Sequence, residues 1–180
     1  MNNMKGKFYI KTNNEIKYKI EYSLKEDSSL MVDYYFGNYE LLLGNGYHIA
    51  IGINKESGEC LSVCCLLDAL SFKKKDINFL VEDNEQYALI YTSTDLYNGA
   101  GEHYVPFERK CYYDSSKSIL AFGNIYDEAK IISFNSNTFA KLKNDELLAL
   151  YIKVSHDVIF YIENRKQPRI WDKLRVLLRH

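Results

Sequence analysis

Residues 47–67, YHIAIGINKESGECLSVCCLL, contain two apolar runs on either side of a polar turn that ends in glycine. In the first run Ile49, Ile51 and Ile53 share one face of a strand, because successive side chains of a strand point to opposite faces. The other face, and both faces of the second run, are mostly small or apolar, which is typical of strands in a sheet covered on each side. Gly58 can adopt the positive φ that a hairpin loop of about three to five residues needs. We therefore predict a β-hairpin at the centre of the fold, with its turn in solvent.

The composition of the chain favours one β-rich domain. With 180 residues the chain can bury one hydrophobic core, and nothing in it requires a second. Its 16 tyrosines and 9 phenylalanines favour strands, and 2 prolines leave few forced breaks. We expect residues 1–180 to form a single mainly β domain, an antiparallel β-sandwich or half-barrel of about ten strands with a C-terminal amphipathic helix.

Alternation of apolar and polar residues predicts strands in most of the remaining chain. Residues 146–154 contain helix-forming Glu, Leu and Ala, but Tyr151, Ile152 and the alternation favour a strand. Residues 68–78 form either a short helix or a loop, and Pro106 requires an edge, a bulge or the first turn of a strand. Other strands are predicted over residues 5–11, 15–22, 30–36, 39–43, 86–92, 104–113, 118–123, 129–134, 137–142 and 158–162.

The last residues, 168–180, are predicted to form the amphipathic helix. Pro168 fits a first helical turn, and the apolar residues that follow recur at three- and four-residue spacing. This apolar stripe can pack on the sheet, with the lysines and arginines of the helix balancing an acidic body. Alternatively, the same cations contact RNA or an anionic lipid surface.

The charge distribution argues against general nucleic-acid binding and membrane insertion. The formal net charge is −1, but basic residues gather from residue 165 onward and leave the rest of the chain acidic. General nucleic-acid binding needs a basic face, which an acidic body does not supply. Charged residues interrupt every apolar run, and residues 1–11 lack the apolar core of a signal peptide. We therefore expect a cytoplasmic protein that neither spans a membrane nor binds nucleic acid directly.

The residue types that bind metals and cofactors do not form a recognised pattern. Cys60, Cys64, Cys65 and Cys111 lack the paired spacing of a zinc site and the spread of a disulfide framework, so we interpret them as free, buried thiols. The four histidines form no HxH or HExxH motif, and the glycines do not fit a phosphate-binding loop. We expect no metal and no cofactor.

His103 is the best single candidate for acid–base chemistry. Glu102 precedes it in a loop with glycines, and Glu108 and Arg109 follow it. A hydrolase built on this histidine also needs a second proton-transfer group and a cation, and the sequence does not show them converging. The alternative interpretation is an exposed loop histidine with no catalytic role.

Three groups of residues combine carboxylates with tyrosines or with one another. Tyrosine buries a large area at low entropic cost, and carboxylates steer a basic partner, so such groups suit a protein interface. A tyrosine-rich core with solvated loops would give the same pattern. The candidate binding residues are Asp33, Tyr34, Tyr35, Glu82, Asp83, Glu85, Asp95, Tyr97, Glu102 and Tyr104.

Three stretches, IGINKESGECLSV, YYDSSKSILAFG and NTFAKLKNDELLALYIKV, resemble immunity proteins of bacterial contact-dependent growth inhibition and polymorphic toxin systems. Many members carry a proline and a tryptophan after the hairpin, and residues 67–72 contain neither, so no functional residue is carried over. The resemblance implies a small cytoplasmic protein without catalytic activity. Such a protein binds the C-terminal domain of one cognate toxin, often a basic nuclease, as a monomer in a one-to-one complex and occludes its active site or substrate groove.

Overall fold

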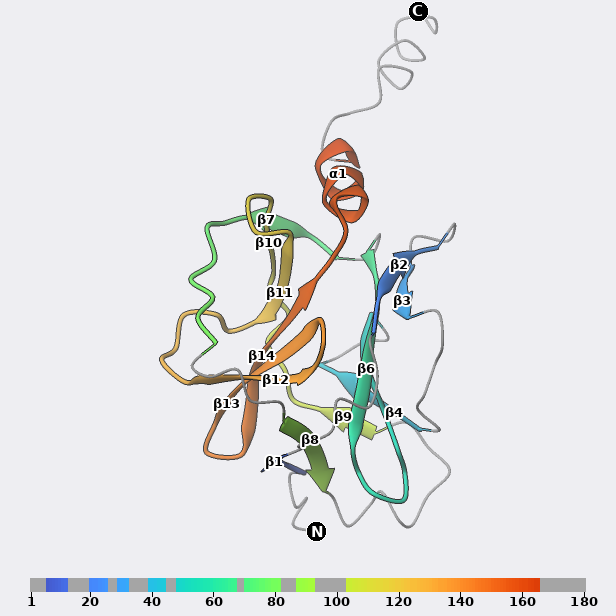
Figure 1. Cartoon of the computed structure of the whole chain (residues 1–180), viewed down its shortest axis with the longest axis vertical. Helices are drawn as coiled ribbons and strands as arrows, with labels where there is room; N and C mark the ends of the chain where they lie inside the picture. Colours follow the sequence, from blue (N-terminus) through green and yellow to red (C-terminus); the bar gives the residue numbers. More distant parts are fainter. Residues whose placement is uncertain are drawn as a thin grey trace, which may run out of the picture.

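A computed structural model of the chain describes residues 6–12, 20–25, 29–32, 39–44, 48–67, 70–81, 87–92 and 103–165. Within these residues the protein is mainly β, as predicted, and its strands form two larger sheets and one short sheet (Figure 1). The first sheet has the order β2 (Tyr22–Leu24), β3 (Ser29–Val32), β6 (Cys60–Leu66), β5 (Ile49–Ile53), β4 (Tyr39–Leu43) and β9 (His103–Val105). The second has the order β12 (Lys130–Asn135), β13 (Thr138–Lys143), β14 (Glu146–Lys153), β11 (Ile119–Gly123), β10 (Cys111–Asp114) and β7 (Phe72–Lys74).

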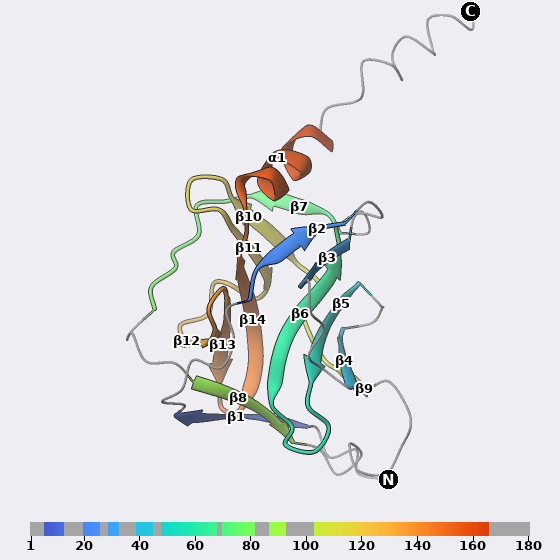
Figure 2. The same ribbon diagram turned by 45° about the vertical axis from the view of Figure 1, so that its right-hand side comes forward.

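The short sheet and one helix lie at opposite ends of this sandwich-like arrangement (Figure 2). The short sheet pairs β1 (Lys7–Thr12) with β8 (Tyr87–Thr92) in antiparallel register. The helix is α1 (His156–Arg165), and its Val158, Ile159 and Ile162 enter the main core. No helix among the described residues is long and apolar enough to span a membrane.

The predicted central hairpin is confirmed as β5 and β6, which pair in antiparallel register in the interior of the first sheet. All five residues of β5 are buried, as a strand covered on both faces requires. In the turn, the side chain of Asn54 accepts hydrogen bonds from the backbone N–H groups of Glu56 (2.9 Å) and Ser57 (3.3 Å). Glu56 and Ser57 are exposed as predicted. Gly58, at φ 72°, is buried and accepts a hydrogen bond from the N–H of Tyr91 in β8 (2.8 Å).

The main hydrophobic core lies between the inner faces of the two larger sheets and contains side chains of both. Two polar contacts also cross this core. The hydroxyl of Tyr22 in β2 hydrogen-bonds the hydroxyl of Thr138 in β13, and the amide of Asn135 in β12 donates to the carbonyl of Leu61 in β6 (3.1 Å). These contacts fix how the sheets face each other, because a buried polar group without a partner is costly.

The outer face of the second sheet is covered by the extended segment that follows β7. Ile77 is buried in a second hydrophobic cluster, and the ring of Phe79 packs against Phe139 (centroids 4.8 Å apart) and Tyr151 (5.3 Å). From the sequence, residues 68–78 are expected to form a short helix or a loop. The described residues of this range instead form strand β7, which pairs with β10, and then continue without regular structure.

Two of the strand predictions that fall on described residues are wrong. Residues 158–162 lie in α1, because Val158, Ile159 and Ile162 also fit one face of a helix, and Ser155 and Asp157 provide a polar helix start. Residues 104–113 contain parts of two strands in different sheets, β9 and β10, since the chain leaves the first sheet at Pro106. The strand over residues 146–154 is confirmed as β14. The predicted helix over residues 168–180 lies outside the described residues.

The four cysteines are free, as predicted. Cys60, Cys65 and Cys111 are buried, and Cys64 faces the opposite side of β6 from Cys65 and is half-buried. Burial raises the pKa of the Cys64 and Cys111 thiols to about 11, so both stay protonated at neutral pH. These cysteines therefore act as small apolar residues in the described structure.

Candidate functional site

Most of the candidate binding residues from the sequence lie outside the described residues. Tyr104 is placed in β9 by its backbone, opposite Leu42 of β4, and His103 lies opposite Leu41. The candidates outside the described residues are Asp33, Tyr34, Tyr35, Glu82, Asp83, Glu85, Asp95, Tyr97 and Glu102.

These candidates fall in residues 33–38, 82–86 and 93–102. The described residues next to each range show where that range joins the fold. β4 begins at Tyr39 and β9 begins at His103, and the two strands are parallel neighbours. The chain therefore enters the first sheet from residues 33–38 and from residues 93–102 at the same end of adjacent strands. Residues 82–86 join instead at Tyr87, which pairs with Thr12 in the short sheet. The structure therefore brings the end of residues 33–38 and the end of residues 93–102 to the same edge of the first sheet, whereas residues 82–86 lead into the short sheet.

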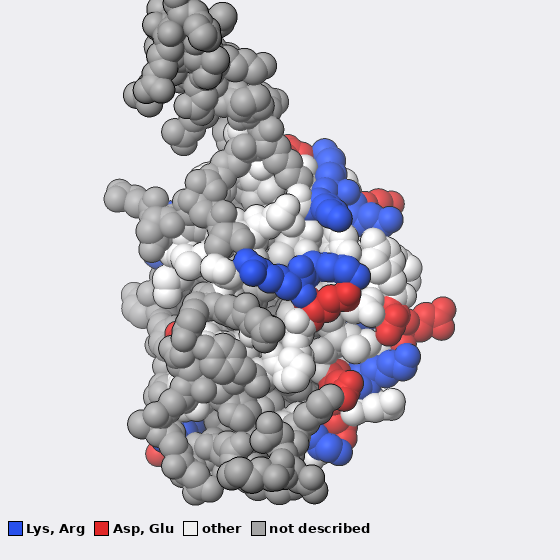
Figure 3. Space-filling model, turned by 180° about the vertical axis from the view of Figure 1, so that it is seen from behind, with Lys and Arg blue, Asp and Glu red and all other residues white. Residues whose placement is uncertain are grey.

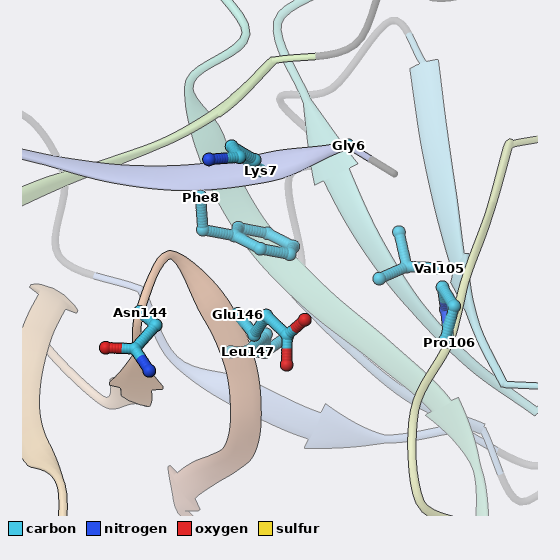
Figure 4. A pocket seen from close by; sticks show the side chains of 8 residues that line it. All are labelled: Gly6, Lys7, Phe8, Val105, Pro106, Asn144, Glu146 and Leu147. Atoms are coloured by element: carbon cyan, nitrogen blue, oxygen red, sulfur yellow. The ribbon is translucent and has the colours of Figure 1, made fainter. Parts of the chain in front are cut away.

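A cavity of about 320 Å³ lies where the short sheet, the end of β9 and the β13–β14 turn meet (Figure 4). It is close to both attachment points of residues 93–102. The segment leaves β8 after Thr92, which pairs with Lys7, and returns at His103, two residues before Val105. The cavity is lined by Gly6, Lys7, Phe8, Val105, Pro106, Asn144, Glu146 and Leu147.

The wall formed by the β13–β14 turn is fixed by its backbone. Asn144 and Asp145 have φ values of 52° and 63°, and Lys143 pairs with Glu146, which are the features of a two-residue hairpin turn with both central residues left-handed. The carbonyl of Asp145 accepts a hydrogen bond from the N–H of Phe8 (2.9 Å), and its carboxylate lies 3.7 Å from the ammonium of Lys7. Both contacts hold the turn against β1.

The described lining of the cavity combines an apolar floor with the exposed residue Glu146 as its one carboxylate. Phe8, Val105 and Leu147 are buried and supply the floor. The carboxylate of Glu146 points into the cavity between Phe8 and Pro106, whereas the ammonium of Lys7 points away from them (Figure 4). Among the described residues Glu146 forms no ion pair. A group with an apolar body and a positive end matches this combination.

The charges elsewhere on the surface are mixed. Figure 3 shows a face on which lysines and arginines alternate with carboxylates in the part of the chain that the structure describes. The described residues on that face therefore form no continuous acidic patch. For the charge of the group that the protein binds, the position of a single carboxylate such as Glu146 is more informative than the net charge of the chain.

A second cluster of charged residues, around Asp114, has a structural role. The buried Asp114 carboxylate accepts hydrogen bonds from the N–H of Ile77 (2.9 Å), from the N–H and hydroxyl of Ser116 (2.9 and 2.6 Å) and from the ammonium of Lys117 (3.1 Å). Burial by itself would raise the pKa of this carboxyl, but these donors outweigh burial and hold the pKa well below its usual range. Its acceptor sites are occupied, so the cluster holds residues 76–77 to the β10–β11 turn.

No three His, Cys, Asp or Glu side chains in the described ranges are placed to hold a metal ion together. Comparison of the chain with protein-family models and with curated proteins finds no match. Function is therefore inferred from the residues and geometry of this chain.

The lining residues of the cavity were not predicted from the sequence as a site. A turn at residues 143–145 is visible from its polar composition, but nothing local connects it to Phe8 or Val105, which are far away in the chain. The Asn-Asp pair between two alternating runs is the signal that predicts a tight hairpin and hence a fixed backbone at Glu146.

Proposed function

We propose that the protein is an immunity protein that binds one cognate toxin domain, a basic nuclease, and occludes its active site or substrate groove. The observation that carries the proposal is the carboxylate of Glu146 at the rim of an apolar cavity, beside Thr92 and His103, the described residues on either side of the stretch that contains the candidates Asp95, Tyr97 and Glu102. An apolar anchor site with a charged group at its edge is the usual composition of a protein-binding hot spot.

The mechanism would combine steering and occlusion. Carboxylates on the binding face attract a basic domain and raise the association rate, and burial of tyrosines then slows dissociation. The toxin is inhibited because its substrate groove is covered by the rigid end of the sandwich. The complex would contain one copy of each protein and form in the cytoplasm, where a nuclease meets its substrate.

The sequence alone leaves two alternative functions: a nucleic-acid-associated role through the predicted basic helix at residues 168–180 and a hydrolase built on His103. The helix residues lie outside the described residues, and His103 is placed only by its backbone at the start of β9. We therefore treat these two functions as outcomes that the experiment on the immunity function must separate.

The test is capture of the partner from nuclease-treated lysate of the native host, with three baits: the wild-type protein, Glu146→Lys and Glu128→Lys. Glu128 is an exposed carboxylate in a loop that does not line the cavity, so its reversal makes the same charge change elsewhere. We expect the wild type and Glu128→Lys to retain one basic domain, encoded beside this protein as the C-terminal part of a larger secreted protein. Glu146→Lys should retain it at least about tenfold more weakly.

Capture of RNA before nuclease treatment, with no stoichiometric protein afterwards, would contradict the proposal and favour the nucleic-acid role. Recovery of no specific partner by the wild type would also contradict it. Turnover that His103→Ala abolishes in a correctly folded protein would favour the hydrolase.

A further inference from the structure

We infer that the cavity between β1, β9 and the β13–β14 turn receives the side chain of one arginine or lysine of the bound toxin domain. This inference rests on the proposed function for the source of the cation, and it adds the chemical identity of the contact. The geometry that supports it consists of the apolar floor, the Glu146 carboxylate and the fixed turn that presents it.

The charges around the cavity favour a cation over an anion. Among the described residues that line the cavity, Lys7 is the one cation, and its ammonium points away from the floor and lies 3.7 Å from Asp145. An anion entering the cavity would meet the carboxylate of Glu146. A cation would meet the same carboxylate, which forms no ion pair with another described residue.

The floor of the cavity suits the aliphatic stem of a long basic side chain. The ring of Phe8 and the side chains of Val105 and Leu147 are buried and apolar, and they line the cavity from the three strands β1, β9 and β14 (Figure 4). Lysine and arginine place their methylene groups against such surfaces while the charged end reaches a polar partner. A volume of about 320 Å³ is at the lower end for small-ligand sites and leaves room for one such side chain.

The cavity is also formed before a partner arrives, which reduces the entropic cost of binding. The hydrogen bond from Phe8 to Asp145 and the left-handed conformation of Asn144 and Asp145 fix the backbone at Glu146, whose side chain is exposed. A fixed backbone removes part of the conformational cost of binding a cation, and the Glu146 side chain still has to order. This arrangement favours a contact that both partners present in their unbound conformations.

The first test uses a small probe in place of the toxin. Nα-acetyl-arginine amide is titrated into the isotope-labelled protein, with Nα-acetyl-citrulline amide as a neutral probe of nearly the same shape, and backbone amide shifts are followed by NMR. We expect saturable shifts at Phe8, Glu146 and Leu147 with the arginine probe and much smaller ones with citrulline. Glu146→Gln should weaken the arginine affinity by about three- to tenfold, and Glu128→Gln should leave it unchanged.

The outcomes separate the inference from the proposed function. Equal shifts for the two probes, shifts confined to other residues, or no saturable shift at these amides would overturn the inference without affecting capture of a toxin by the wild-type protein. The same spectra show whether Glu146→Gln is folded. In the complex, replacing the toxin's basic residues one at a time should reveal one whose effect disappears in the Glu146→Gln background, and the absence of any such residue would also overturn the inference.

Discussion

Replacing Gly58 by alanine is expected to lower the free energy of unfolding by about 3 to 4 kcal/mol. Gly58 ends the central hairpin turn at φ 72°, a conformation that costs an alanine about 1 kcal/mol or more. A Cβ at this position would also lie 2.3 Å from the carbonyl oxygen of Tyr91, which is backbone and cannot rotate away. Relief of this clash requires the turn to move from β8 and lengthens the hydrogen bond from Tyr91 to Gly58.

Urea denaturation of Gly58→Ala and of Glu56→Ala measures this effect. Glu56 is exposed in the same turn, and only its backbone N–H contributes to the turn hydrogen bonds, so its replacement should change stability by less than about 0.5 kcal/mol. Equal stabilities of Gly58→Ala and the wild type would mean that the turn does not dock on β8 as described.

Replacing Asp114 by asparagine is expected to cost about 3 kcal/mol at neutral pH. Both oxygens of this buried carboxylate accept hydrogen bonds, and one of the donors is the Lys117 ammonium. Asparagine would turn an NH₂ group toward at least one of them and would leave that donor unsatisfied. The exposed Asp76 also pairs with Lys117 and is the matched control, because Asp76→Asn should cost less than about 1 kcal/mol.

The pH dependence of stability tests the same site by its charge. The pKa of the Asp114 carboxyl is lowered in the folded protein, so the unfolded chain takes up its proton first as the pH falls. The stabilisation by this carboxylate is therefore complete above the unfolded pKa of about 4 and is lost as the pH falls toward the folded value. The stability gap between wild type and Asp114→Asn should narrow between pH 6 and pH ~2.5, and a gap that stays constant would contradict a charged Asp114.

Local patterns in the sequence predict the strands where side chains alternate and a turn residue is chemically required. The β5–β6 hairpin is predicted correctly because Gly58 and the isoleucines of β5 constrain one structure. Residues 158–162 are predicted wrongly because five apolar residues in a row fit a buried strand as well as a helix face. Ser155 as a helix cap was the local signal for the helix.

The candidate site depends on contacts that no local pattern contains. Lys7, Val105 and Glu146 come from three parts of the chain and meet only because the short sheet closes one end of the sandwich. Asp95, Tyr97 and Glu102 were predicted from the sequence as binding residues, and Thr92 and His103, the described residues on either side of their stretch, lie beside the cavity. Their role in toxin binding remains a prediction.

The most direct test of the immunity function is a titration of the captured toxin domain with this protein, with the toxin's own activity as the readout. We predict that activity falls linearly and reaches its background at one molecule of protein per toxin, and that Glu146→Lys needs a large excess while Glu128→Lys behaves as the wild type. Full toxin activity in the presence of excess wild-type protein would contradict the account, because a bound protein that leaves the active site open is not an immunity protein.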